Sequence, residues 1–150
     1  DRSGTGGEPR SGMLRQVALG GAVFALCVAV HAWAMLVAIR VLGPRLARTG
    51  ESAALVSTMV AVVCTLALAH LAEVGLWGVG MAVVGAVGPE EGPFYFAFVS
   101  YTTLGYGDVL AAREWRLLGP AAAMNGILLF GWSTAVIFHV LADTMRRARQ

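Results

Sequence analysis

Three long stretches of this 150-residue sequence contain no charged residue, and they limit the folds open to it. They cover residues 16–39, 52–72 and 117–142. A helix needs about 20 apolar residues to cross a bilayer, so each stretch is long enough for one span. Only 13% of all residues are charged, against roughly 25% in soluble domains. The sequence therefore predicts an all-α membrane protein with three transmembrane helices.

Apolar character continues beyond these stretches, so the expected helices are longer than the uncharged runs. We expect an extra N-terminal helix over residues 13–42, an outer helix over 52–88 and an inner helix over 117–147. The polar, glycine-rich residues 1–12 are expected to be disordered. Residues 43–51 are expected to form a cytoplasmic loop.

A fourth apolar segment, residues 92–107, is too short to span. Even if wholly helical it would reach only about 24 Å, against roughly 30 Å for the hydrocarbon core. Non-helical backbone at membrane depth is tolerated only where it is buried in protein or lines a water-filled cavity. The segment is therefore predicted to be re-entrant, with a short helix over residues 93–102 and an extended return over 103–108. Pro93 suits the first turn of that helix.

The return carries the sequence T-T-L-G-Y-G-D, in which Gly105 and Gly107 are two positions apart. A dehydrated cation needs oxygen ligands in place of its water, and rings of backbone carbonyls can supply them. Glycine at every second position can adopt positive φ, which allows successive carbonyls to face one side. We expect four inward-facing carbonyls, with the Thr103 hydroxyl completing the innermost ring; they belong to Thr103, Leu104, Gly105 and Tyr106.

The stretch S-Y-T-T-L-G-Y-G-D at residues 100–108 resembles the selectivity-filter signature of potassium channels. Residues 125–135, N-G-I-L-L-F-G-W-S-T-A, are similar to the inner helix of bacterial two-helix potassium channels, and Gly126 falls where that family keeps its hinge glycine. The resemblance covers residues 52–147 and implies a potassium-channel pore module. It also implies that the short helix is a pore helix and that K⁺ binds along the filter, which comprises Thr103, Leu104, Gly105, Tyr106 and Gly107.

Several positions around the filter depart from the family pattern. Leu104 stands where valine or isoleucine is commoner, and Val99 stands where some members have a buried glutamate. Tyr95 and Phe96 replace the usual tryptophan of the aromatic cuff. The expected supports of the filter are Thr102, Asp108, Tyr95, Glu73 and His70.

One chain supplies one filter strand, and one strand cannot surround an ion, so we expect a homotetramer of identical subunits. Because the filter is entered from outside, the inner helix runs inward and Arg146 is cytoplasmic. The loop at residues 43–51 is then also cytoplasmic and carries arginines, as the positive-inside rule requires. The N-terminus is predicted outside, although Arg10 and Arg15 precede the first span. These features predict a multi-pass protein of the bacterial inner membrane, surrounded by lipid.

An ionisable group inside a membrane helix is costly and by default functional, which draws attention to Glu73. His70 lies three residues earlier on the same face and is its expected partner. We expect Glu73 to accept hydrogen bonds from the pore helix or filter; the alternative is that it snorkels to the outer interface. Further gating or cavity-lining candidates lie on the inner helix: Asn125, Gly126, Ile127, Gly131, Thr134, Phe138 and His139. Close helix packing is the alternative role for its glycines.

Other classes of function find little support in the residues. There is no nucleophile–base pair or phosphate-binding glycine loop, so we expect no enzyme and no cofactor beyond permeant K⁺. A net charge of +2 gives no reason to expect a nucleic-acid partner. No span has the regularly spaced arginines of a voltage sensor, and the opening stimulus is not legible. Two alternatives remain open, namely a weakly selective cation channel and a non-conducting sensor with His70 and Glu73 as a proton-responsive pair.

The two cysteines lie inside apolar runs and are expected to pack as small hydrophobic residues. Cys27 and His31 are one helical turn apart, which raises the question of zinc. A closed zinc site needs four converging ligands, however. Cys64 and His70 are six residues apart and point to different faces of their helix, so we do not expect such a site.

Overall fold

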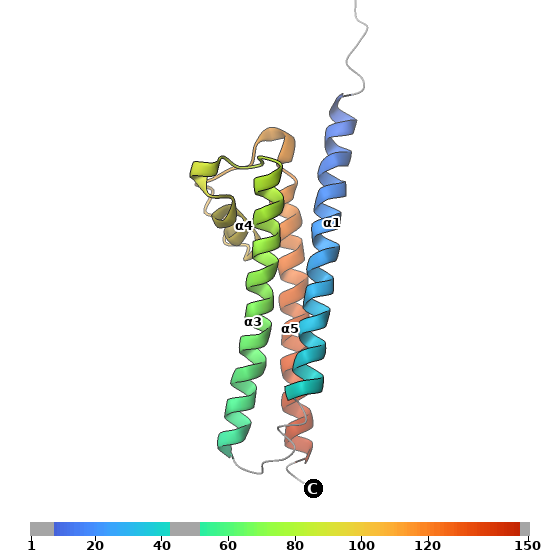
Figure 1. Cartoon of the computed structure of the whole chain (residues 1–150), viewed down its shortest axis with the longest axis vertical. Coiled ribbons are helices and arrows are strands. Elements are labelled where there is room, and N and C mark those ends of the chain that lie inside the picture. The colour runs from blue at the N-terminus through green and yellow to red at the C-terminus, as the bar shows by residue number, and fades with distance from the viewer. Residues whose placement is uncertain (1–7, 43–51, 148–150) are drawn as a thin grey trace, which may run out of the picture. The chain divides into compact units, whose positions relative to one another are not determined.

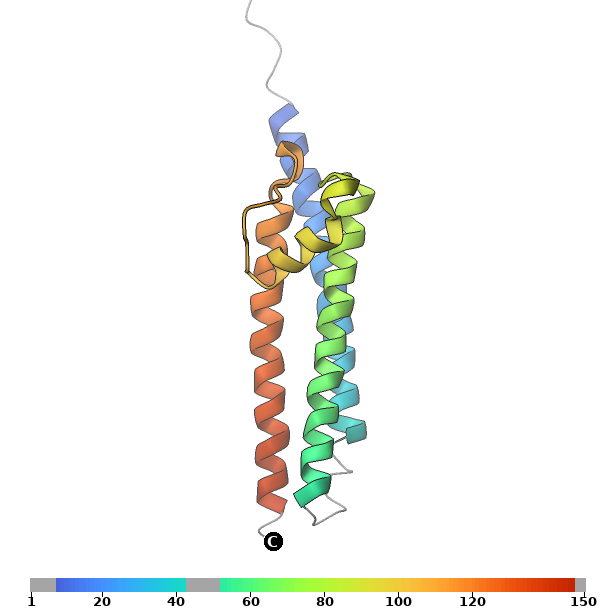
Figure 2. The ribbon, with the colours of Figure 1, turned by 90° about the vertical axis from the view of Figure 1, so that its left-hand side faces the viewer.

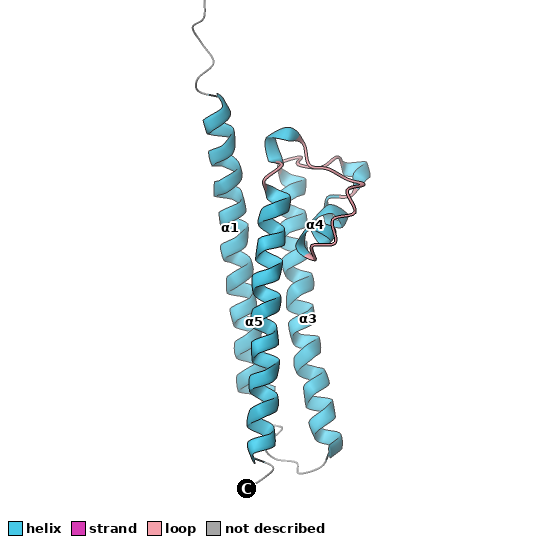
Figure 3. Cartoon of the chain, turned by 180° about the vertical axis from the view of Figure 1, so that it is seen from behind, coloured by secondary structure: helices cyan, strands magenta, loops and turns pink. Residues whose placement is uncertain are grey.

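The structure is a computed structural model that describes residues 8–42 and 52–147. Its long helices are α1 (Glu8–Val37), α3 (Ser52–Val83) and α5 (Leu118–Arg147) (Figure 1). A π-helical segment, Ala38–Leu42, continues α1. Figure 3 shows that the described residues form helices and connecting loops, without a strand. The expected all-helical architecture is therefore confirmed for this part of the chain.

Three described helical stretches are long and apolar enough to cross a membrane. They are Ser11–Arg40, Val56–Val83 and Arg113–Asp143. Large apolar side chains remain exposed on them, among them Leu14 at 65% and Leu68 at 66%. Exposed apolar surface of this extent marks contact with lipid or with another protein. The chain is therefore a multi-pass membrane protein.

Short elements connect α3 to α5. They are a 3-10 turn (Pro89–Glu91), the helix α4 (Pro93–Tyr101) and a second 3-10 turn (Arg113–Trp115). The bounds of α4 and α5 agree with those predicted to within about one residue at each end. The outer helix ends earlier than expected, at Val83, because Gly85 has a positive φ of 64°. The Gly85 N–H donates to Ala82 O and the Ala86 N–H to Met81 O, a Schellman motif that closes the helix.

The first helix begins before its predicted start. We expected disorder throughout residues 1–12, but α1 begins at Glu8. Pro9 is compatible with helix there, because the first turn has no use for its missing N–H. The predicted disorder of residues 1–7 and the predicted loop at 43–51 lie outside the described residues.

The chain divides into two compact units, and each long helix contributes to both. The first unit contains α1 up to Cys27 and all of Val74–Ile127. In it the Leu117 N–H donates to Gln16 Oε1 at 2.9 Å, which ties α1 to the start of α5. A Cβ atom at Gly20 would lie 3.6 Å from Ala121 Cβ, so the backbone of α1 approaches α5 closely.

The second unit contains Val28–Glu73 and the chain from Leu128 onward. Its three helical segments share one apolar core. The buried members of that core are Met35, Ala38, Val62, Leu66, Val136 and Val140.

Candidate functional site

The helix α4 of the first unit ends in a defined way and directs the chain into the segment that follows. Pro93 occupies its first turn, as predicted. At its other end the Thr102 N–H donates to Phe98 O at 3.0 Å, and the Thr102 hydroxyl donates to the same oxygen at 2.8 Å. Thr102 thus closes the helix. Figure 2 shows α4 and the extended segment that leaves its end.

The extended segment has an alternating backbone. Thr103, Gly105 and Gly107 have φ values of 60°, 52° and 77°, all in the left-handed region. Among the described residues, Thr103 is the only non-glycine residue with positive φ. The positive φ expected for both glycines is confirmed. That of Thr103 was not expected, because a β-branched residue pays a steric cost for it.

Two backbone hydrogen bonds hold the beginning of this segment against α4. The Thr103 N–H donates to Ser100 O at 2.9 Å, and the Gly105 N–H donates to Val99 O at 3.1 Å. The strained φ of Thr103 is thus paired with local hydrogen bonds that fix it.

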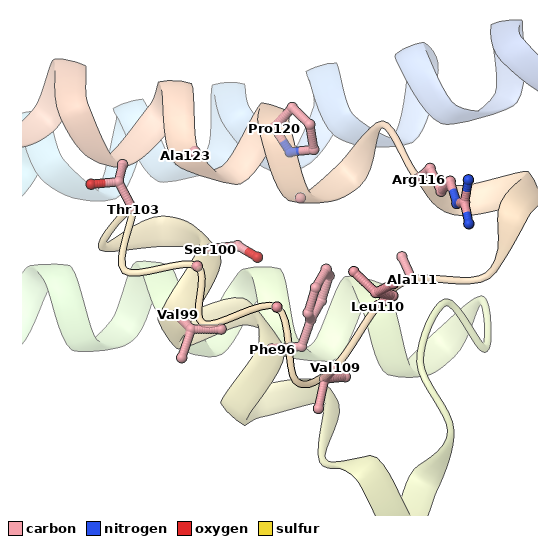
Figure 4. Close-up of a pocket in the computed structure, with 13 residues that line it drawn as sticks. Phe96, Val99, Ser100, Thr103, Val109, Leu110, Ala111, Arg116, Pro120 and Ala123 are labelled. Atoms are coloured by element: carbon pink, nitrogen blue, oxygen red, sulfur yellow. The ribbon is translucent and has the colours of Figure 1, made fainter.

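The side chains of the segment are exposed in the single chain. Leu104 is 52% exposed and Tyr106 is 69% exposed. The Tyr106 side chain is therefore not buried against α4 within one chain. Behind the segment lies an open cavity of about 630 Å³ (Figure 4). Its lining combines α4, the segment and the start of α5, and includes Phe96, Ser100, Thr103, Gly105, Pro120 and Ala123.

Two expected supports of the segment contact each other. The Tyr95 hydroxyl donates to Asp108 Oδ2 at 2.6 Å. The second carboxylate oxygen, Oδ1, accepts the Val109 N–H at 3.1 Å. The hydrogen bond to Asp108 raises the pKa of the Tyr95 hydroxyl above its ordinary value.

On the inner helix, Gly126 is a packing position. A Cβ atom there would overlap the Tyr101 carbonyl oxygen, so only glycine fits against the end of α4. The other candidate hinge, Gly131, has no neighbouring atom within 4 Å of such a Cβ atom. The two roles considered for these glycines were gating and close helix packing. The contact at Gly126 agrees with close packing.

Asn125 differs from its expected role. It is fully buried, and its Oδ1 accepts the Trp77 indole N–H at 2.9 Å. A cavity-lining position is therefore not supported for it, and the residue instead links α5 to α3 within the first unit. The other candidates are exposed on α5 in the single chain; they are Ile127, Gly131, Thr134, Phe138 and His139.

Glu73 has the predicted partner and one that was not predicted. Its Oε2 lies 3.0 Å from His70 Nδ1, which confirms the expected pair. Its Oε1 lies 2.8 Å from His31 Nδ1. Glu73 is fully buried, which excludes snorkelling to the interface, and histidines rather than filter groups occupy both its oxygens. These hydrogen bonds lie within the second unit, and the bracing contact that we expected between Glu73 and the pore helix or filter stays a prediction.

Sequence reasoning missed His31 and Ser133 as members of this cluster. Ser133 Oγ lies 3.1 Å from His31 Nε2 and 3.0 Å from His70 Nε2. The available signal was an ionisable residue, His31, in the middle of an uncharged span. Ser133 gave no signal, because serine is common in membrane helices. Of the cysteines, Cys27 is buried as expected, whereas Cys64 is exposed.

A short helix, a segment with alternating left-handed residues and a long apolar helix follow one another between Pro93 and Arg147. Comparison with known families supports an ion channel. Residues 91–143 match the family model described as "Ion channel", and this match covers α4, the return segment and most of α5. No curated protein and no solved structure matches the chain.

Proposed function

We propose that this chain is the subunit of a homotetrameric, potassium-selective channel that conducts K⁺ passively across the bacterial inner membrane. The observation that carries the proposal is the alternation of positive φ at Thr103, Gly105 and Gly107 in an exposed segment. This alternation meets the backbone condition for carbonyls that face one axis. It occurs in T-T-L-G-Y-G, the sequence in which potassium channels use such carbonyls.

In this proposal, the ion-binding groups belong to the backbone. The carbonyls of Thr103, Leu104, Gly105 and Tyr106 replace the hydration shell of K⁺, and the Thr103 hydroxyl completes the innermost ring. Leu104 is compatible with this role because its carbonyl binds the ion. The Tyr95–Asp108 hydrogen bond holds the outer end of the segment.

Four copies are proposed because one segment cannot surround an ion. The exposed side of residues 103–108 and the open cavity of about 630 Å³ leave room for a neighbouring subunit. Four α4 helices would also aim their partially negative C-terminal ends at the central cavity and stabilise an entering cation. Tyr106, exposed in the single chain, would then pack against a second subunit.

The proposed orientation places the C-terminus and residues 43–51 in the cytoplasm and the N-terminus outside. Arg40 and Arg146 flank the described spans on the proposed cytoplasmic side, as the positive-inside rule favours. Residues 89–116, between α3 and α5, would then form the re-entrant loop and outer mouth.

Potassium flux into liposomes that contain the purified chain tests the proposal. We expect uptake that barium blocks and that Gly105→Ala abolishes, because alanine at a φ of 52° is strained. Gly75→Ala is the matched control, since a Cβ atom there meets nothing within 4 Å and the site lies within α3. Absence of barium-sensitive flux in tetrameric wild-type protein would favour the non-conducting alternative. Equal flux of sodium would favour a weakly selective channel.

A further inference from the structure

Four polar side chains from three helices meet inside the second unit. His31 comes from α1, His70 and Glu73 come from α3, and Ser133 comes from α5. Three of them are buried, at 0% exposure for His31, 0% for Glu73 and 6% for Ser133. The proposed ion path does not use them, so their burial needs a separate explanation.

The two imidazole rings are arranged alike. Each turns Nδ1 toward a different oxygen of the Glu73 carboxylate, at 2.8 Å for His31 and 3.0 Å for His70. Each turns Nε2 toward the Ser133 hydroxyl, at 3.1 Å and 3.0 Å respectively. The ring centroids are 4.9 Å apart. One ligand atom from each of His31, His70 and Glu73 lies within 4.8 Å of the other two.

In their simplest charge state, the four side chains carry too few protons for all four contacts to be hydrogen bonds. An ionised carboxylate, two neutral imidazoles and one hydroxyl carry three protons between them, and four hydrogen bonds need four. The arrangement also leaves one negative charge buried among helices, which is costly without a compensating cation. One further positive centre, either a fourth proton or a metal ion, completes these four contacts.

We propose that His31, His70 and Glu73 bind one divalent transition-metal ion, for which Zn²⁺ is the natural probe. Two imidazoles and one carboxylate are a frequent zinc ligand set, with a fourth position for water or hydroxide. The metal takes the place of protons on both Nδ1 atoms. Each Nε2–H then donates to Ser133 Oγ, which has two lone pairs to accept them.

Ser133 is a positioning residue in this site. Metal-bound histidines commonly donate their second ring N–H to a neighbouring acceptor, which fixes the tautomer and the ring orientation. Aromatic rings lie close to both imidazoles, with Trp132 at 5.8 Å from His31 and Phe130 at 4.4 Å from His70 between centroids. Each imidazole thus has one aromatic ring beside it.

The bound ion would fasten α1 to α3 within the second unit. His31 is the only ligand from α1, whereas the other two come from α3. This role is independent of the proposed potassium conduction. It assigns α1 a task that the ion path does not require.

Metal content of the purified full chain tests the proposal. The protein, without a polyhistidine tag, is stripped with a chelator in detergent, reloaded with Zn²⁺ and passed through a desalting column. We expect about one zinc per chain by mass spectrometry and a zinc-dependent rise in melting temperature. His70→Gln and Glu73→Gln should lose both effects, whereas His139→Gln, at an exposed histidine of α5, should retain them.

Ser133→Ala keeps the test decisive if a ligand variant does not fold, because it retains all three ligands. We expect it to bind zinc about 10- to 100-fold more weakly than wild type. Co²⁺ in place of Zn²⁺ should give the visible absorption of a four-coordinate nitrogen and oxygen site. Folded wild-type protein that retains no zinc would overturn the proposal and leave a fourth proton as the missing positive centre. Equal retention by Glu73→Gln would overturn it as well.

Discussion

The return segment and the histidine cluster are the two proposed cation sites of this chain, and they are built in opposite ways. The segment offers backbone oxygens, is exposed in one chain and is one quarter of the proposed site. The cluster offers side chains, is buried and draws all of its groups from one chain. The first site depends on assembly, whereas the second depends only on the packing of α1, α3 and α5. A substitution in one chain should therefore disable a filter that four chains share, whereas it should disable only the histidine cluster of that chain.

Mixtures of wild-type and variant chains should show the largest difference between the two sites, in potassium flux for the segment and in zinc content for the cluster. If equal amounts of wild-type and Gly105→Ala chains assemble at random, roughly one sixteenth of tetramers contain four intact filter strands. Potassium flux should therefore fall about sixteenfold. Equal mixing of wild-type and His70→Gln chains should only halve the zinc content. A linear fall of flux with the mutant fraction would contradict a filter shared by four copies.

Removal of the Glu73 carboxylate should have the largest effect on the free energy of unfolding. Glu73→Ala leaves the buried His31 imidazole and the partly buried His70 imidazole without their shared acceptor, and we expect a loss of about 3–5 kcal/mol. Reversible unfolding in mixed micelles measures this loss. Glu90→Ala, at an exposed acid, is the control and should change stability little. A loss below about 1 kcal/mol for Glu73→Ala would show that the cluster is not a stabilising centre.

Gly126→Ala should have the next largest effect on the free energy of unfolding. The added Cβ atom overlaps the Tyr101 carbonyl oxygen, so α5 must move away from the end of α4. Overpacking of this kind costs about 1–3 kcal/mol. Gly131→Ala should be neutral or mildly stabilising, because its Cβ atom meets nothing within 4 Å. If both variants unfold at the same denaturant concentration, the close contact is absent from the folded protein.

Loss of the Trp77–Asn125 hydrogen bond should lower the free energy of unfolding somewhat less than Gly126→Ala does. Trp77→Phe removes the donor, and because Asn125 Nδ2 has no hydrogen-bond partner among the described residues, no group there then satisfies the buried amide. We expect a loss of about 1–2 kcal/mol. The double variant Trp77→Phe/Asn125→Leu should recover most of it, since no polar group is left unpaired. A double-mutant cycle without coupling would argue against the contact.

Tyr95→Phe should have the smallest effect, because the hydroxyl is exposed in the single chain. Its hydrogen bond to Asp108 raises the pKa of Tyr95 above the ordinary value of 10.0. The stabilisation is therefore fully present below pH 10 and is lost as the pH rises through the raised pKa. We expect a slightly lower melting temperature for the variant at pH 8 and no difference once the wild-type phenol has ionised. A gap that widens with alkaline pH would contradict this sign.

The sequence was informative where a property is local. Apolar run lengths predicted the three long helices, and the spacing of Gly105 and Gly107 predicted their left-handed backbone. The i, i+3 spacing of His70 and Glu73 predicted their contact. Each of these depends on residues close together in the chain, so no tertiary information was needed.

The remaining features depend on how distant segments align. His31 is 42 residues from Glu73 and 102 from Ser133, and their meeting depends on the register between helices. The same register turns Asn125 toward Trp77. The positive φ of Thr103 reverses the usual preference of a β-branched residue and is fixed by hydrogen bonds that α4 accepts. Neither the register nor these hydrogen bonds could be read from residue types.

The reversal potential in a planar bilayer with potassium on one side and sodium on the other tests the central claim most directly. The proposed ring of carbonyls selects the larger ion, so the current should reverse close to the potassium equilibrium potential. Gly75→Ala should reverse at the same voltage. A wild-type current that reverses near zero under this gradient would contradict a potassium-selective filter at residues 103–107.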